Sequence, residues 1–218
     1  QKQNAIMCQT YFTGLWVTGK KVSNSWAHAD EESSVYELKA YVENIFLRLG
    51  LNMRNLVVGN LTDDIYAAAL SVQTKGGKRL ATFGIVTKKI LKAFDIDNEV
   101  YYADLNWKEL MKAIRSVKIS YAEISKFPAV KRDLALLVDK KVQFAEIEKI
   151  AYETEKKLLK DVSLFDVYEG KNLETGKKSY AVSFLLQDEN QTLNDKMIDK
   201  IMSKLVKNLE DKLDAKLR

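Results

Sequence analysis

Apolar residues in the first half of the chain alternate between the spacing of a strand and that of a helix. Residues 7–18 (MCQTYFTGLWVT) are rich in β-branched and aromatic side chains, which predicts a strand. Apolar residues recur every three or four positions over 35–49, which predicts a helix. Ser33 or Ser34 is suited to cap its start, and Gly50 occupies the position after its end.

A β-hairpin is predicted next, because two strand-like runs flank a short polar link. The link contains Gly76 and Gly77, which supply the positive φ angles that such a turn needs. The strands of the hairpin are expected at 65–73 and 79–86, a helix at 87–94, a strand at 99–105 and a helix at 107–115. Short links between strands favour antiparallel pairing.

The second half has the pattern of a split βαβ unit. Strands are expected at 132–139, 162–168 and 179–187, helices at 144–158 and from Asn194 to about 213, and a short last strand at 215–218. The order is β-α-β-β-α-β, which is the ferredoxin-like arrangement. The only proline, Pro128, disfavours helix at the residue before it and marks the boundary between the two halves. Two domains are therefore expected, 1–123 and 124–218.

Strand alternation in the second half divides the side chains between two faces. The bulky face, which the helices should cover, is predicted to hold Leu134, Leu136, Val138, Phe165, Val167, Tyr180, Val182, Phe184 and Leu186. The other face is predicted to be small and polar, with Asp133, Ala135, Asp166, Tyr168, Ser179, Ala181 and Ser183. Leu137, Leu164 and Leu185 are expected on this second face, where they would suit partial cover by other protein.

Composition and charge add little to this pattern. The 218 residues carry a net charge of +5, with 16 basic and 13 acidic side chains before Ile124 and 19 and 17 after it. This balance permits nucleic-acid contact without requiring it. No apolar run approaches the roughly 20 residues of a membrane span, and the single cysteine, Cys8, fits a reducing cytosol. The N-terminus lacks Met, as expected of a fragment or a processed chain.

Four blocks in the second half occur in a familiar order. They are FPAVKRDLAL at 127–136, LFDVYEG at 164–170, GKKSYA at 176–181 and QTLND at 191–195. They resemble the ferredoxin-fold anticodon-binding domain that ends the β subunit of bacterial phenylalanyl-tRNA synthetases. In the first half, YELKAYVE at 36–43 is similar to a helix of the catalytic-like module of the same family, although Ala40 replaces the usual glycine. The stretches at 83–86 and 100–105 are similar to the hairpin and strand that follow it.

The resemblance implies an α+β fold class, with an antiparallel class II synthetase-like module at 1–123 and the βαββαβ domain at 124–218. The chain would be a C-terminal part of the β subunit, acting in the cytoplasm within an (αβ)2 heterotetramer. Its partners would be tRNA(Phe) and the α subunit, and no membrane. ATP and magnesium would serve the full synthetase, in which the α subunit catalyses, and no cofactor or metal would bind this part.

The resemblance also assigns roles to individual residues. Asp166, Tyr168 and Ser179 occupy the positions where the family contacts the anticodon. Possible phosphate contacts are assigned to Lys131, Arg132, Lys177 and Lys178. An exposed ring can stack on a base, and a carboxylate can accept hydrogen bonds from base-edge amino groups.

No catalytic residue is expected. Gly76–Gly77 lacks the spacing of a glycine-rich ATP-binding strand. His28, the only histidine, has no Cys or His partner for zinc, and Cys8 is expected to be an inert thiol. Two other functions stay open. One is a small acyl-phosphate hydrolase, for which the loop at 139–142 lacks the required glycine and arginine. The other is a purely structural protein-interaction module.

Overall fold

The computed structural model describes residues 12–118, 120–121, 123–170 and 173–218. The chain divides into two compact units, Gln1–Tyr121 and Ala122–Arg218, each with its own sheet and apolar core. Cys8 and the first part of the strand predicted at 7–18 lie outside the described residues.

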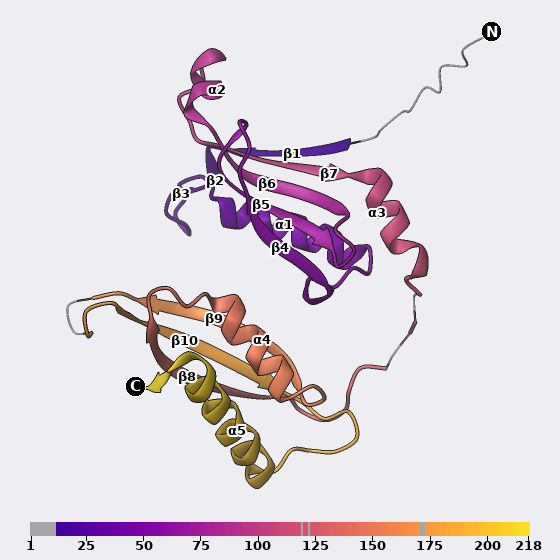
Figure 1. Cartoon of the computed structure of the whole chain (residues 1–218), viewed down its shortest axis with the longest axis vertical. Helices are drawn as coiled ribbons and strands as arrows, with labels where there is room; N and C mark the ends of the chain where they lie inside the picture. Colours follow the sequence, from indigo (N-terminus) through magenta and orange to yellow (C-terminus); the bar gives the residue numbers. More distant parts are fainter. Residues whose placement is uncertain (1–11, 119, 122, 171–172) are drawn as a thin grey trace. The chain divides into compact units, whose positions relative to one another are not determined.

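The first unit is built on a five-stranded antiparallel sheet with the order β1-β7-β6-β5-β4 (Figure 1). Its strands are β1 (Phe12–Thr18), β4 (Leu56–Leu61), β5 (Tyr66–Thr74), β6 (Arg79–Val86) and β7 (Val100–Asn106). A separate two-stranded ribbon pairs β2 (Lys20–Val22) with β3 (Glu31–Glu32). The helices are α1 (Val35–Arg48), α2 (Lys88–Ala93) and α3 (Trp107–Ala113), with short 3-10 turns at Met53–Asn55 and Ile114–Ser116.

Local sequence signals place α1 as predicted. The side chain of Ser34 accepts a hydrogen bond from the backbone N–H of Glu37, which caps the first turn. The helix ends before Gly50, whose φ of 76° is one that glycine adopts without strain. The buried side of α1 carries Leu38, Val42 and Phe46, which join the core of the first unit.

Strand β4, which was not predicted from the sequence, pairs with β5 as the edge strand of this sheet. Its six residues contain Gly59 and have mostly exposed or half-buried side chains, so the alternation that marks a strand is weak. The predicted hairpin of β5 and β6 is present, and Gly77 takes a φ of 77° in its turn.

The second unit confirms the predicted β-α-β-β-α-β order. Its elements are β8 (Val130–Asp139), α4 (Phe144–Thr154), β9 (Leu159–Tyr168), β10 (Lys177–Leu186), α5 (Asp195–Leu213) and β11 (Lys216–Leu217). The four strands form an antiparallel sheet with the order β11-β8-β10-β9. Both helices lie on the same side of it (Figure 1).

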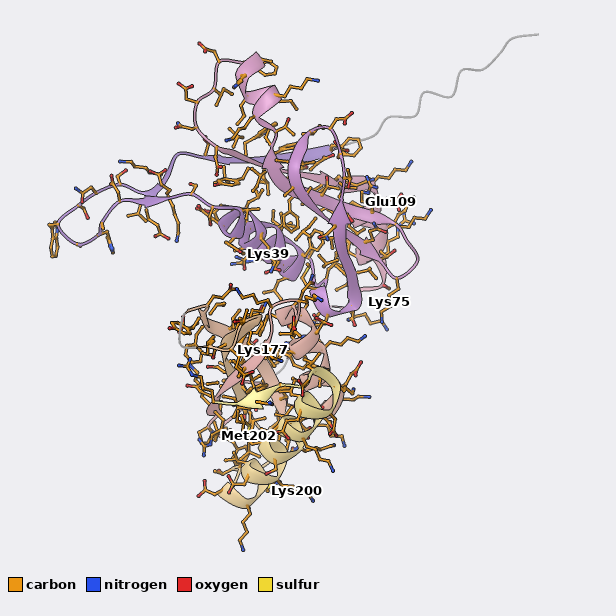
Figure 2. The ribbon with its side chains drawn as sticks, turned by 60° about the vertical axis from the view of Figure 1, so that its left-hand side comes forward. Lys39, Lys75, Glu109, Lys177, Lys200 and Met202 are labelled. Carbon is orange, nitrogen blue, oxygen red and sulfur yellow. The ribbon has the colours of Figure 1, made fainter. Side chains whose placement is uncertain are left out.

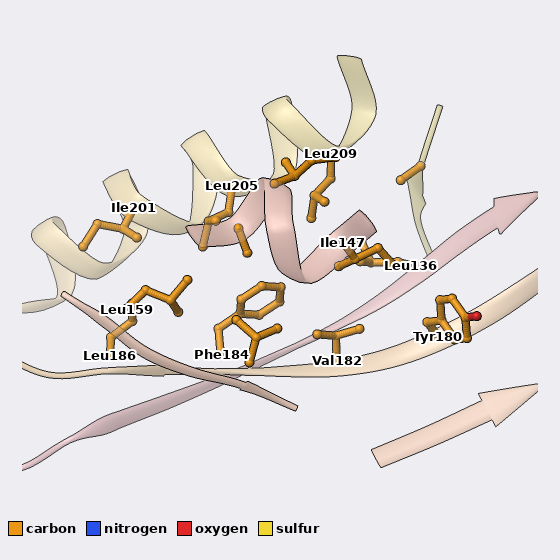
Figure 3. Close-up of a cluster of buried hydrophobic side chains, with 14 of the residues drawn as sticks. Leu136, Ile147, Leu159, Tyr180, Val182, Phe184, Leu186, Ile201, Leu205 and Leu209 are labelled. Carbon is orange, nitrogen blue, oxygen red and sulfur yellow. The ribbon is translucent and has the colours of Figure 1, made fainter. Parts of the chain in front are cut away.

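The core of the second unit fills the space between the two helices and one face of this sheet. Figure 3 shows Phe184 and Val182 of β10 pointing toward Leu205 and Leu209 of α5, and all four are fully buried. Asn194 caps α5, since its side chain accepts the N–H of Met197 at 2.9 Å. One face of the sheet therefore packs against the apolar sides of α4 and α5, and no helix of the described residues covers the other face.

Two details of the second unit differ from the sequence prediction. Helix α4 ends at Thr154 and not at 158, and two residues of α5 bind this last residue: Lys204 donates to the Thr154 carbonyl and Asn208 donates to the Thr154 hydroxyl. The carboxylate of Glu155 then accepts the N–H groups of Lys157 and Leu158, which fixes a turn in place of another helical turn.

The second difference is a β-bulge in β9. Asp166 pairs with Ala181 and Leu164 pairs with Val182, so Phe165 is an extra residue without a partner in the ladder. Leu164 therefore packs against the core, on the face opposite to the one predicted for it. Phe165 was predicted to lie beneath the helices, and its side chain is instead 58% exposed.

Close packing of β6 on β5 gives a test of the first unit. A Cβ at Gly84 would lie 2.2 Å from the carbonyl oxygen of Ala68, whereas one at Gly59 would meet nothing within 4 Å. We expect Gly84→Ala to lower the free energy of unfolding by about 1–3 kcal/mol through overpacking. Urea denaturation followed by tryptophan fluorescence measures this unit, because Trp16, Trp26 and Trp107 all lie in it. Gly59→Ala is the matched control, and equal midpoints for the two variants would contradict the expectation.

Candidate nucleic-acid interface

The face of the second sheet that the helices leave uncovered, called the open face below, consists of cross-strand rows. Each row is read across β9, β10 and β8. The rows are Tyr168–Ser179–Leu137, Asp166–Ala181–Ala135, Ser163–Ser183–Asp133 and Asp161–Leu185–Lys131. Small side chains occupy most central positions, so backbone and hydroxyl groups lie near the surface of the sheet.

Tyr168 is the aromatic residue at one end of this face, and its side chain is 37% exposed. A Cβ added to Gly170 would lie 2.3 Å from the Tyr168 hydroxyl oxygen, so the ring folds back over this glycine. The guanidinium carbon of Arg218 lies 5.3 Å from the ring centroid, within the range of a cation–π contact. The ring thus occupies the space left free by the missing Cβ of Gly170, and it faces the cationic side chain of Arg218.

The two polar residues predicted beside Tyr168 lie next to it in the register. Ser179 pairs directly with Tyr168 and is 6% exposed, so its side chain lies at the floor of the face. Asp166 lies in the adjacent row and is exposed, with the methyl groups of Ala181 and Ala135 as its row neighbours. The structure therefore brings a ring, a hydroxyl and a carboxylate together at one end of the open face.

Asp133, further along the open face, is already engaged. The Ser183 hydroxyl donates a hydrogen bond to its carboxylate across the β8–β10 pair. This pairing uses a polar group that would otherwise be available to a ligand, so the carboxylate nearest to Tyr168 that can accept from a ligand is Asp166.

The four basic residues predicted to contact phosphates are not gathered in one place. Lys131 belongs to the open face, and its Nζ lies 5.6 Å from the ring centroid of Phe165. Lys177, labelled in Figure 2, lies at the start of β10 and forms an ion pair with Asp214 at 3.6 Å.

The other two basic residues belong to the helix-covered side. Arg132 pairs in register with the core residue Phe184 and reaches Asp195 at 3.7 Å. Lys178 is 8% exposed, and its Nζ lies 4.6 Å from the centroid of the Tyr180 ring. Neither side chain lies on the open face.

Arg218 is a residue of this face that the sequence analysis missed. Its backbone N–H donates to the carbonyl of Ala135 at 3.0 Å, which continues the β11–β8 pairing and aligns Arg218 with the row of Ala135, Ala181 and Asp166. A two-residue strand gives no alternation to analyse, so only its position at the end of the predicted strand could have drawn attention to it.

The loop between β8 and α4 bears on the acyl-phosphate hydrolase alternative. Such an enzyme needs loop N–H groups and cations directed at a phosphate. Here the N–H of Lys141 donates to the carboxylate of Asp139 at 2.9 Å, and the N–H of Val142 donates to the Asp139 carbonyl. The loop is therefore closed by an anionic side chain, which disfavours an anion site.

The sheet of the first unit carries a concave surface of its own. A cavity of about 510 Å³ is lined by Phe12, Gln73, Gly77, Arg79, Ala81, Thr82, Asp104 and Asn106. Burial raises the pKa of the Asp104 carboxyl above its usual range, and its Oδ1 is buried without a hydrogen-bond partner among the described residues. Nearby, the rings of Trp16 and Tyr102 stack with their centroids 3.9 Å apart.

The described residues contain no cluster of three or more His, Cys, Asp or Glu side chains arranged to hold a metal ion. A bilayer-spanning helix is likewise not found in the part of the chain that the structure describes.

Each of the two units is similar to a known protein family. The ferredoxin-fold anticodon binding domain matches residues 125–218, which agrees with the fold of the second unit. The phenylalanyl tRNA synthetase beta chain CLM domain matches residues 2–107.

Comparison with individual proteins gives the same family. The phenylalanine–tRNA ligase beta subunits of Bacteroides fragilis and Bacteroides thetaiotaomicron are 85% and 84% identical over 218 residues, which is 100% of this chain and 27% of each relative. The corresponding subunit of Porphyromonas gingivalis is 51% identical over 205 residues, 94% of this chain and 25% of that relative. The chain spans about a quarter of the length of these curated relatives.

The buried carboxyl of Asp104 makes the first unit sensitive to pH. Because its pKa is higher folded than unfolded, the folded state holds the proton more tightly, and stability falls as pH rises through this carboxyl's titration. We expect Asp104→Asn to raise the urea midpoint at pH 7, with the gain shrinking as the pH falls through the raised pKa of the folded carboxyl and vanishing below about 4, where the unfolded carboxyl is also protonated. Asp97→Asn, at an exposed position, is the control. A gain that is independent of pH would show that ionisation is not the cause.

Proposed function

We propose that this chain, which belongs to the phenylalanyl-tRNA synthetase β-chain family, recognises the anticodon of tRNA(Phe) through the open face of its second unit. The observation that carries the proposal is the exposed Tyr168 ring beside the carboxylate of Asp166, over a floor of small side chains. In the full phenylalanine–tRNA ligase, this contact would select the tRNA to which phenylalanine is attached.

The chemistry of the face suits an unpaired base. A base stacked on the Tyr168 ring gains on the order of 1–3 kcal/mol, and the floor of Ala181 and Ala135 lets it approach the sheet closely. Asp166 accepts hydrogen bonds from base-edge N–H groups, and the Ser179 hydroxyl can donate or accept. Asp166 and Ser179 would therefore form hydrogen bonds with the edge of a base that is stacked on the Tyr168 ring.

Backbone phosphates would be met at the margins of the face. Lys131 and Lys177 are the proposed contacts there, together with Arg218. The same role for Arg132 and Lys178 requires RNA to approach the helix-covered side, where Arg132 faces Asp195 and Lys178 is buried. The small number of available cations implies recognition by a few placed contacts and a modest dependence of affinity on salt.

We assign no catalytic step to this chain. The first unit is proposed to be a non-catalytic, class II synthetase-like module, with ATP and magnesium bound by the α subunit. The groups on its sheet do not fit a nucleoside triphosphate, because the half-buried carboxylate of Asp104 would repel the phosphates and, among the described residues, Arg79 is the only basic one that lines the cavity.

Assembly with the α subunit, in a cytoplasmic (αβ)2 heterotetramer, is the second part of the proposal. Tyr36 and Leu47 on α1 are both largely exposed. They are eleven residues apart, which is close to three helical turns, so they lie on the same side of the helix. An exposed apolar stripe of this kind suits a protein partner.

The anticodon proposal is tested with the chain and anticodon stem-loop RNA. We expect Tyr168→Ala to weaken binding by about 5-fold to 100-fold, the loss of one stacked base, and to reduce discrimination against a stem-loop with a changed anticodon. Fluorescence anisotropy measures both. Val167→Ala is the control, since Val167 follows the core-facing register of β9. Equal affinity of the unaltered chain for cognate and altered stem-loops would refute anticodon recognition.

The assembly proposal is tested by light scattering after gel filtration. The chain mixed with the α subunit should elute with a mass above that of either component. Leu47→Lys should shift the mixture toward separate components, because it places a charge in the apolar contact. Lys75→Glu, in the exposed β5–β6 turn, should leave the assembly intact (Figure 2). Separate elution of the unaltered components would rule out a contact made by this chain alone.

A further inference from the structure

Phe165 is an exposed aromatic residue that belongs to neither of the two apolar cores. It is the unpaired residue of the β9 bulge and is absent from the apolar core that its neighbour Leu164 joins. Burying a phenylalanine is strongly favourable, and a ring left 58% exposed by a local distortion of the strand forgoes most of that gain.

The bulge directs this ring to the open face. Lys131 belongs to the row of Asp161 and Leu185 on that face, and its Nζ lies 5.6 Å from the centroid of the Phe165 ring. Three residues further along β9, at the end of the strand, the guanidinium of Arg218 lies 5.3 Å from the Tyr168 ring. The open face therefore carries two exposed rings, each with a cation beside it.

We propose that Phe165 and Lys131 form a second nucleotide site on the open face, in which the ring stacks a second unpaired base and the ammonium contacts its phosphate. The inference rests on the proposed function, because it takes the RNA that Tyr168 would bind and extends its path along β9. Tyr168 and Phe165 are three residues apart, roughly 10 Å at the rise of a strand.

Three observations favour RNA as the occupant. Four-stranded sheets of this topology bind single strands by stacking two or three bases on exposed aromatic residues. The surface around the Phe165 ring is polar, with Asp166 on the side toward Tyr168 and Ser163 on the other side along β9. A protein partner would favour an apolar centre with a polar rim, and here each ring has polar side chains directly beside it in the neighbouring rows.

The pairing of each ring with a cation fits the same occupant. A nucleotide presents a planar face and an anionic phosphate, and a ring beside an ammonium or a guanidinium matches both. Lys131 is free to move toward a phosphate, because no carboxylate is within ion-pair distance of it among the described residues.

The experiment uses the chain and anticodon stem-loop RNAs that carry 2-aminopurine at one anticodon position at a time, since stacking quenches this base. We expect quenching at two positions with the unaltered chain. Phe165→Leu should restore fluorescence at one of them and weaken binding by about 5-fold to 100-fold, and Phe165→Tyr should retain both. Tyr168→Leu should restore fluorescence at the other position. Lys131→Gln should weaken binding and reduce its salt dependence by about one phosphate contact.

Controls separate this inference from the function on which it rests. Val167→Thr alters another exposed apolar residue of β9 and should change neither signal. If Tyr168→Leu weakens binding while Phe165→Leu does not, the second site is refuted and anticodon binding stands. If Phe165→Leu weakens only binding to the α subunit, the ring is a protein contact and the inference is also refuted. Absence of RNA binding by the unaltered chain would refute both.

Discussion

Helices α4 and α5 cover one face of the β8–β11 sheet, and this one-sided cover determines what the other face can be. Phe184, Val182 and Leu136 supply the apolar layer beneath the helices, so the side chains between them in sequence must face away. An uncovered face of bulky apolar residues would promote aggregation, whereas small polar residues leave it both stable and accessible. The composition of the open face is therefore a consequence of how the core is built.

Features set by neighbouring residues could be predicted from the sequence, and those set by distant ones could not. The cap at Ser34, the turn at Gly77 and the cap at Asn194 depend on adjacent residues and lie where the sequence indicates. The end of α4 depends on Asn208, fifty-four residues away. The bulge depends on the pairing of β9 with β10, so strict alternation wrongly placed Leu164 and Phe165.

The residues of the candidate site also differ in whether neighbouring or distant parts of the chain determine their positions. Alternation predicted the neighbours Asp166, Tyr168 and Ser179, because the register runs undisturbed between the bulge and the end of β9. The positions of the cationic groups were harder to predict, because the long side chains of lysine and arginine lie wherever distant residues offer them a contact. Lys178 covers the Tyr180 ring and Arg132 turns to Asp195, whereas Arg218 reaches Tyr168 across two strands.

The bulge also makes β9 tolerant of a change in length. Inserting or deleting a residue in a regular strand reverses the facing of every residue beyond it. Phe165 has no ladder partner, and Leu164 and Asp166 face opposite sides as adjacent residues of a regular strand would. Deleting Phe165 would leave the core and the Asp166–Tyr168 surface in register. The ring is therefore a separable part of the strand, whose removal would not require the rest of the domain to be rebuilt.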